Sequence, residues 1–325
     1  MLVHGWLKSV ANGGDYYSEQ GFVCTRSQII LNLCTWAVPP QIKNPRSLPA
    51  RAYVAPLIAV LERDLANQYG GAPLYVFDYQ SFSPYQTSAR ELADSLTKVK
   101  SRDSLEGFVI VGHSMGGLVA RAAAQLLEKD TLTSQTILGI LSLATPHMGT
   151  PLPALTVAGV FWPGITSPGG QSLLPQNFLP RSEHVALIAY GGDIDGVASR
   201  HRIYYSSWRL LCANVRADCK NDGVVPVSSA LPDRFASTAF TIRRNEFSIY
   251  DHSQMAYGDG PSQDPLGLYS KIAADLSMLL RRAGADSLWY DLEISGGAVG
   301  APLTPVRVSV RDGRSARTNI RSHSP

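Results

Sequence analysis

Short apolar runs, rich in branched and aromatic residues, alternate along the chain with segments whose apolar residues recur at helical spacing. This alternation is typical of an α/β fold, in which helices cover a mostly parallel sheet. The predicted strands cover residues 1–3, 74–79, 107–111, 137–144, 185–190 and 237–242. The predicted helices cover residues 53–68, 87–100, 115–128 and 266–282.

Two insertions and a C-terminal extension interrupt this rhythm. Residues 150–181 are apolar and rich in proline and glycine, whereas residues 194–221 hold a cysteine pair and several aromatic side chains. Residues 286–310 have a short β-like pattern, and residues 311–325 form a Ser/Arg tail that we expect to be disordered. We therefore expect one domain over residues 1–285 that carries both insertions, followed by the extension and the tail.

The composition is that of a globular protein, with 45% hydrophobic and 17% charged residues. A formal charge of +3 suggests a polyanionic partner, but residues 301–325 alone hold five arginines and one aspartate. Because the remainder is nearly neutral, we expect no nucleic-acid partner.

The four cysteines form two local pairs, which predict the disulfides Cys24–Cys34 and Cys212–Cys219; buried free thiols are the alternative. Disulfides indicate a secreted or periplasmic protein, although the chain begins without a signal-peptide pattern. No Cys/His cluster indicates zinc, and no apolar run reaches the roughly 20 residues of a membrane span.

Residues 112–117 carry the strongest chemical signal, Gly-His-Ser-Met-Gly-Gly. They follow a predicted strand and open a predicted helix, which is the context of a G-x-S-x-G nucleophile elbow. Gly112 and Gly116, two residues to either side of Ser114, would permit the sharp turn that exposes its hydroxyl. We predict that Ser114 is a nucleophile; an ordinary serine in a glycine-rich turn is the alternative.

A serine nucleophile needs a base and an acid further along the chain. His252 alone among the seven histidines follows the last predicted strand and precedes the last long helix, so it is the predicted base. Asp222, in a tight glycine turn before an apolar stretch, is the favoured acid, with Asp193 or Asp195 as alternatives. The acid would orient the His252 ring and stabilise the imidazolium.

The oxyanion of an acyl-transfer intermediate needs two N–H donors. The residue after the nucleophile, Met115, supplies one, and Trp6 in the glycine-containing loop after the first strand is the predicted second donor. His113 and His147 are candidate substrate-contacting residues, and for His147 a role in fastening its loop is the favoured alternative.

The ordered set of motifs resembles the α/β-hydrolases of the lipase kind, similar to bacterial triacylglycerol lipases and to the GPI-inositol-deacylase-like group. The matching pieces are residues 3–5, 112–121, 143–149, 221–226 and 251–252. The resemblance implies an α/β-hydrolase fold with a mostly parallel central sheet flanked by helices. It also implies hydrolysis of carboxylic esters through an acyl-enzyme, with Ser114, Asp222 and His252 in the triad positions and no cofactor.

By the same resemblance, residues 150–181 stand where such enzymes carry an apolar lid or cap, whose Phe161 and Trp162 would contact an acyl chain. A well-packed surface insertion is the alternative. The implied partner is a lipidic or acyl-ester substrate, met in transient contact with a membrane or lipid interface. Some lipases bind calcium through an aspartate two residues after the histidine, but Gln254 stands there, so we expect no metal.

The beginning of the chain departs from this group, whose members have at least a full strand before the His-Gly loop. Only residues 1–3 precede it here, and we expect a fragment or a misplaced start codon, which would also account for the missing signal peptide. Acyl transfer with the same triad and a catalytically inactive binding protein are the alternative functions. The oligomeric state stays open.

Overall fold

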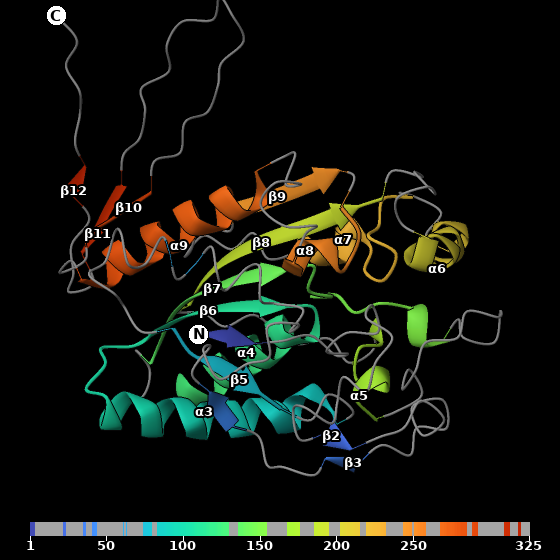
Figure 1. Ribbon diagram of the computed structural model, residues 1–325. Helices are drawn as coiled ribbons and strands as arrows, with labels where there is room; N and C mark the ends of the chain where they lie inside the picture. Colours follow the sequence, from blue (N-terminus) through green and yellow to red (C-terminus); the bar gives the residue numbers. More distant parts are fainter. Residues whose placement is uncertain are drawn as a thin grey trace, which may run out of the picture.

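The alternating pattern corresponds to a seven-stranded central sheet with the order β4-β5-β1-β6-β7-β8-β9 in the computed structural model of the chain (Figure 1). The structure describes residues 1–3, 22–23, 35–36, 41–43, 61, 63, 74–79, 83–129, 136–154, 168–175, 185–194, 202–214, 219–231, 243–248, 250–257, 267–284, 288–291, 309–312 and 318–319. The strands of the central sheet are β1 (Leu2–Val3), β4 (Gln41–Lys43), β5 (Val76–Asp78), β6 (Phe108–His113), β7 (Ile137–Leu143), β8 (Ala186–Asp193) and β9 (Arg243–Ser248).

The neighbouring strands from β5 to β9 pair in parallel, and β4 pairs antiparallel with β5 at one edge. Every residue of β6 and β8 is buried. Parallel strands covered on both faces have this near-continuous apolar character because neither face meets water. The sheet therefore has the mostly parallel, helix-flanked form that the sequence predicts.

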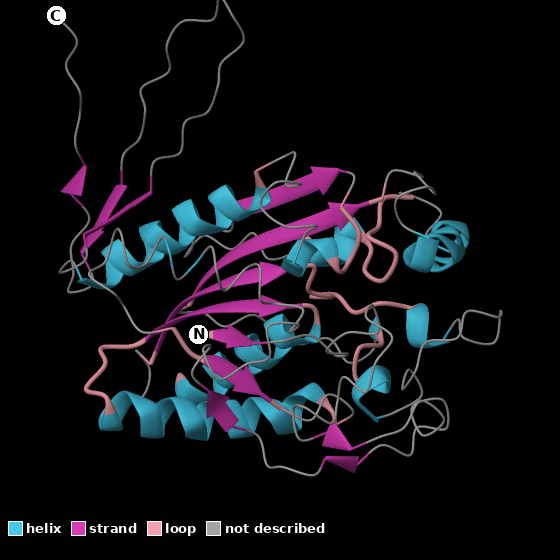
Figure 2. Ribbon diagram, in the orientation of Figure 1, coloured by secondary structure: helices cyan, strands magenta, loops and turns pink. Residues whose placement is uncertain are grey.

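Helices cover both faces of the sheet, as Figure 2 shows. On one face, α3 (Tyr85–Arg102) packs on α4 (Met115–Leu127), and the buried residues of α3 recur at helical spacing. On the other face lies α9 (Leu268–Gly284), whose Ile272, Leu276 and Leu279 join a second apolar cluster with β6, β7 and β8. The two clusters make the sheet a rigid platform between two helical layers.

The last strand differs from its prediction. The predicted segment, residues 237–242, lies outside the described residues, and the last strand of the sheet is β9, which begins at Arg243. Its sequence, Arg-Arg-Asn-Glu-Phe-Ser, lacks the apolar character used to recognise strands. An edge strand pairs on one side only and tolerates such charged residues, which is why the pattern did not reveal it.

The segment 194–221, predicted as an insertion with no assigned helix or strand, contains a helix, α6 (Arg202–Asn214). The structure joins Cys212, in its last turn, to Cys219 by a disulfide. The second predicted disulfide, Cys24–Cys34, lies outside the described residues. A covalent link with a sequence separation of 7 residues holds the chain after α6 close to the helix end.

The described parts of the predicted lid, residues 150–154 and 168–175, are packed into the molecule. Leu152 and Leu173 are buried in the core, and the Thr150 N–H donates to the Leu173 carbonyl at 2.8 Å. Short helical turns, η3 (Leu152–Ala154) and α5 (Pro168–Gln171), shape these parts. They have the character of a packed insertion, while Phe161 and Trp162 lie outside the described residues.

The remaining elements are short. They are β2 (Phe22–Val23), β3 (Thr35–Trp36), α7 (Val227–Ala230), α8 (Gln254–Tyr257), β10 (Leu288–Asp291), β11 (Ser309–Asp312) and β12 (Thr318–Asn319). The last three form a separate antiparallel sheet, so regular structure extends into the tail predicted to be disordered, where β11 pairs with β10. Among the described residues, no helix is both long and apolar enough to cross a membrane.

Candidate active site

Ser114 occupies a sharp turn between the end of β6 and the start of α4. Its backbone angles, φ 54° and ψ −127°, lie in a region that residues other than glycine rarely adopt. Such a conformation costs about 1–3 kcal/mol and persists only where the surroundings enforce it. Here the Ser114 N–H donates to the Leu143 carbonyl at 2.8 Å, which ties the turn to the end of β7.

The glycines around this turn are required by close packing. A Cβ added to Gly112 would lie 2.8 Å from the Cα of Gly117, and a Cβ on Gly117 would overlap the Thr145 hydroxyl. Real Cβ atoms do not approach neighbours so closely, so the strand end, the helix start and the loop after β7 meet only because glycine occupies these positions. The turn lies between a strand and a helix in the predicted order, and the glycines that packing requires there are Gly112 and Gly117.

The structure brings Ser114, His252 and Asp222 into one hydrogen-bonded chain. The Ser114 Oγ lies 2.8 Å from His252 Nε2, and His252 Nδ1 lies 2.8 Å from Asp222 Oδ2. All three residues are buried. Because an ionised carboxylate only accepts hydrogen bonds, Nδ1 of His252 carries the hydrogen and Nε2 is left to accept from the serine hydroxyl.

Asp222 is fixed by its own turn. Its Oδ1 accepts the N–H groups of Val224 and Val225 at 2.9 and 2.7 Å, which leaves Oδ2 for His252. Gly223 has a φ of 89°, a backbone conformation that glycine adopts without strain. Asp193, the alternative acid, accepts the Asn221 N–H at 3.2 Å instead, and Asp195 lies outside the described residues.

The backbone of His252 is held from two sides. Its N–H donates to the Asp222 carbonyl at 2.9 Å, and its carbonyl accepts from His113 Nε2 at 2.8 Å. Asp251 and Gln254 form a reciprocal capping box, with side-chain-to-backbone distances of 2.9 and 2.8 Å, at the start of α8. The spacing Asp-x-x-Gln is the signal in the sequence that predicts this cap. It lies outside the motifs used to predict the site.

His113 lies against the His252 ring, with 4.8 Å between ring centroids. Burial, and next the neighbouring His252, lowers the pKa of His113 well below its usual range. His113 therefore stays neutral and donates to the His252 carbonyl, so that only one of the two adjacent rings is available to take up a proton. Its geometry fits support of His252 better than the predicted contact with substrate.

His147 lies in the loop after β7 and is buried. Its Nδ1 lies 3.1 Å from Arg121 Nη1 and its Nε2 lies 2.8 Å from the Ser142 hydroxyl. Burial, and next the charge of Arg121, lowers the pKa of His147 well below its usual range. Since Arg121 only donates, His147 is a neutral ring that links α4 to β7, which fits the loop-fastening alternative.

Met115 begins α4 directly after Ser114. The N–H groups in the first turn of a helix lack an acceptor within the helix, so Met115 stands at the position that the predicted oxyanion donor requires. The predicted second donor, Trp6, lies outside the described residues.

The candidate site lies at the carboxyl end of the parallel strands, where open α/β sheets bind their ligands. A small apolar cavity of about 100 Å³ lies instead beside Phe108 and Val109, at the start of β6, and so belongs to another part of the molecule. In the part of the chain that the structure describes, no group of three or more His, Cys, Asp or Glu side chains is gathered to hold a metal ion.

Residues 89–217 match the family model described as a PGAP1-like alpha/beta domain. The match spans α4 and the elbow but ends before Asp222 and His252. Triacylglycerol lipase 2 of Saccharomyces cerevisiae is 25% identical to the chain over 154 residues, which are 43% of this chain and 45% of the yeast protein. The alignment thus spans less than half of that curated relative.

Two solved structures are similar to the chain at low sequence identity. The mature lipase of Bacillus licheniformis gives a TM-score of 0.46 at 17% identity, covering 65% of this chain and 83% of that chain. A metagenomic carboxyl esterase gives a TM-score of 0.47 at 16% identity, covering 70% of this chain and 73% of that chain. The sheet order, the PGAP1-like match and the curated relative together support an α/β-hydrolase fold similar to that of lipases and esterases.

Proposed function

We propose that the chain is a serine hydrolase that cleaves carboxylic esters through an acyl-enzyme. One observation carries the proposal: the continuous hydrogen-bonded chain from the Ser114 hydroxyl through His252 to Asp222, with both distances 2.8 Å. These three residues come from separate parts of the sequence. A nucleophile, a base and an orienting acid arranged in this way are what acyl transfer requires.

In the proposed first half-reaction, Ser114 Oγ attacks the ester carbonyl while His252 Nε2 takes the hydroxyl proton. The Asp222 carboxylate keeps the proton on Nδ1 and stabilises the imidazolium that forms. The Met115 N–H, with a second donor for which Trp6 is our candidate, stabilises the tetrahedral oxyanion. His252 then protonates the departing alcohol, which leaves an acyl group on Ser114.

In the second half-reaction, His252 Nε2 takes a proton from water as the water attacks the acyl carbon. The tetrahedral intermediate collapses, Ser114 recovers its proton and the carboxylic acid is released. Neutral His113 supports this cycle because it holds the His252 carbonyl without adding a second charge beside the imidazolium.

A lipidic or acyl ester is the proposed substrate class. The apolar segment 150–181 would contact the acyl chain, with Phe161 and Trp162 as the candidate contacts. The yeast relative is described as a triacylglycerol lipase, which agrees with this class. The Cys212–Cys219 disulfide supports an oxidising compartment, such as the periplasm or the extracellular medium.

The decisive test is Ser114→Ala, assayed with p-nitrophenyl esters of graded acyl length. We expect loss of turnover with an unchanged circular dichroism spectrum, while the unmodified chain should show a preference among chain lengths that defines the acyl site. Labelling by a fluorophosphonate probe should disappear in the same variant. Turnover or labelling that survives the substitution would contradict the proposal, and product analysis with an added alcohol separates hydrolysis from acyl transfer.

A further inference from the structure

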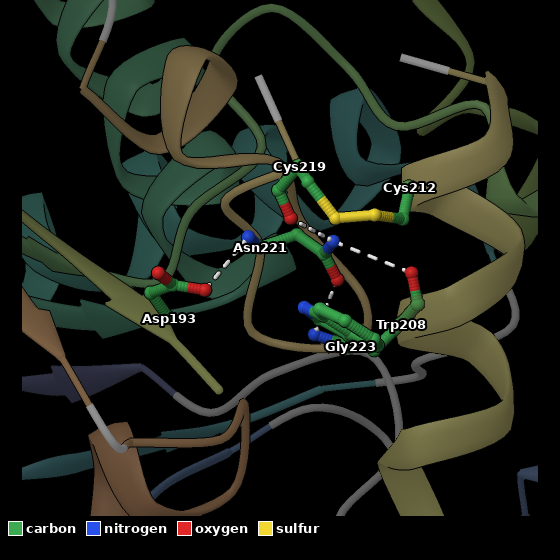
Figure 3. Close-up of a disulfide and its surroundings, with 6 residues drawn as sticks. All are labelled: Asp193, Trp208, Cys212, Cys219, Asn221 and Gly223. Carbon is green, nitrogen blue, oxygen red and sulfur yellow. Dashed lines mark hydrogen bonds between the residues drawn. A yellow bond between two sulfur atoms is a disulfide. The ribbon is translucent and has the colours of Figure 1, made fainter. Parts of the chain in front are cut away.

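Asn221, the residue before Asp222, uses its side chain to connect its own turn to α6 (Figure 3). It is 2% exposed. Its Nδ2 donates to the carbonyl oxygens of Trp208 and Cys219 at 3.4 and 2.9 Å, and its Oδ1 accepts the Gly223 N–H at 2.9 Å. Both donor hydrogens and one acceptor site of the amide are therefore engaged, each with main chain from a different position.

The main chain of Asn221 is bound to the end of β8. Its N–H donates to Asp193 Oδ1 at 3.2 Å, as Figure 3 shows, and its carbonyl accepts the Ile194 N–H at 3.0 Å. Asn221 also forms a β-bridge with Pro226, on the far side of the turn. The turn that carries Asp222 is thus anchored on one side to the central sheet.

On its other side the turn is anchored to α6. Both carbonyl acceptors of the Asn221 amide belong to the disulfide-linked segment, since Trp208 lies in α6 and Cys219 is bonded to Cys212 in the last turn of that helix. The Cα atoms of the two cysteines lie 4.5 Å apart. The Cys219 carbonyl lies two residues before Asn221 along the chain, whereas the disulfide holds α6, and with it the Trp208 carbonyl, close to the Asn221 amide.

The orientation of Asp222 follows from this anchoring. The Asn221 Oδ1 fixes the Gly223 N–H, and the next two N–H groups of the turn bind Asp222 Oδ1. A Cβ on Gly223 would lie 2.5 Å from the Cβ of Tyr204, so α6 also packs directly on the turn. With Oδ1 fixed in this way, Asp222 Oδ2 is directed at His252.

We propose that Asn221 is a positioning residue for Asp222, and that it acts as one unit with the Cys212–Cys219 disulfide, which ties α6, the helix of the Trp208 acceptor, to the segment that carries Asn221. The role in catalysis rests on the proposed function, whereas the positioning of Asp222 against His252 can be measured without any substrate. Asn221 touches no reacting atom. Its effect passes through the turn to Asp222 and from there to the His252 ring.

The test compares Asn221→Ala with the double variant Cys212→Ser/Cys219→Ser and with the combination of all three. Misplacement of a catalytic group by about 1 Å lowers rates by as much as 100-fold, so we expect Asn221→Ala to lower kcat by roughly 10- to 100-fold. KM should change less than about twofold, because substrate contacts are untouched. In Asn221→Asp the new side chain has the same shape but places an oxygen against the two carbonyls. This variant should lose at least as much kcat as Asn221→Ala.

The combined variant distinguishes one unit from two independent supports. If the amide and the disulfide act together, the combined loss in kcat should be close to that of Asn221→Ala alone and well below the product of the two losses. Losses that multiply, or variants that change only KM, would overturn the proposal. Tyr190→Phe is the matched control, because it removes a buried bond to Asp275 between β8 and α9, and it should lower Tm without lowering kcat.

A second measurement needs no activity. In proton NMR, the hydrogen between His252 Nδ1 and Asp222 Oδ2 should give a far-downfield resonance in the unmodified chain. We expect this resonance to be lost or broadened in Asn221→Ala and retained in Tyr190→Phe. A sharp, unshifted resonance in Asn221→Ala would overturn the positioning role, whereas a chain that shows the resonance but no Ser114-dependent turnover would contradict only the proposed function.

Discussion

The nucleophile elbow and the acid turn are rigid for different reasons. The elbow is built from close contacts: a Cβ added at Gly112 would meet the backbone of α4, and one added at Gly117 would meet the Thr145 side chain. The acid turn is built from directed hydrogen bonds, because Asp222 and Asn221 bind backbone groups on every side. Packing dominates in the first region, whereas in the second region directed hydrogen bonds add to the packing of Gly223 against Tyr204.

The two regions also differ in strain. Positive φ angles at the elbow fall on Ser114 and, in the adjoining loop, on Ala144, which are residues that rarely adopt them. In the acid turn the positive φ falls on Gly223. The elbow thus holds an unfavourable conformation in place, whereas the acid turn is relaxed and depends on its partners for position. Strain should therefore appear in the stability of elbow variants, and lost bonds should appear in the rates of acid-turn variants.

Asp222→Asn should have the largest effect. The amide oxygen that this change introduces can still accept from the turn, but the new NH₂ group would face His252 Nδ1 and favour the ring tautomer that cannot accept from Ser114. We expect kcat to fall about 10³- to 10⁴-fold with little change in Tm, measured with p-nitrophenyl esters and by thermal unfolding.

Asp193→Asn is the matched control for the choice of acid. Its amide oxygen can still accept the Asn221 N–H, so we expect a loss in kcat of less than about tenfold. The assignment of the acid would be wrong if Asp193→Asn lost as much as predicted for Asp222→Asn while the latter remained active.

The elbow could be predicted from sequence because its geometry is encoded locally. Residues 107–117 alone contain the strand, the turn and the helix start, and the structure places β6, Ser114 and α4 there in that order. The helices α3 and α9 were predicted for the same reason, since their buried residues recur at helical spacing. Local period and local small residues suffice where packing against a sheet decides the structure.

The acid turn could not be derived in the same way. Chain order left several aspartates open, because the residues that select Asp222 are distant in sequence: His252 lies 30 residues away, and the Asn221 contacts with Trp208 and Asp193 span 13 and 28 residues. The helix α6, which supplies part of this support, lies in a segment predicted only as an insertion. Bonds between distant residues leave little trace in the local pattern.

Gly117→Ala should have an intermediate effect and tests whether packing fixes the elbow. Helix propensity alone would stabilise this change by about 1 kcal/mol. The overlap of the new Cβ with the Thr145 hydroxyl should outweigh that gain and lower the free energy of unfolding by about 1–3 kcal/mol. Urea unfolding measures whether the free energy of unfolding falls or rises.

Thr145→Ala provides the matched suppressor for this clash. It removes the hydroxyl and methyl groups that the added Cβ would meet, so the double variant should recover part of the stability and activity lost in Gly117→Ala. A Gly117→Ala protein more stable than the unmodified chain, or a double variant no better than the single one, would show that close packing does not hold the elbow.

The smallest expected effect is a difference in stability between Ser114→Gly and Ser114→Ala. This comparison separates backbone strain from chemistry at one residue. Both remove the hydroxyl, so both should be inactive, but only glycine adopts φ 54° and ψ −127° without strain. We expect the glycine variant to be more stable than the alanine variant by about 1 kcal/mol in urea unfolding. Ser88, buried within α3, gives the opposite control, because there glycine should be less stable than alanine by about 1 kcal/mol. If the glycine variant were less stable than the alanine variant at both serines, the elbow would be unstrained. The contrast with the acid turn would then rest on packing alone.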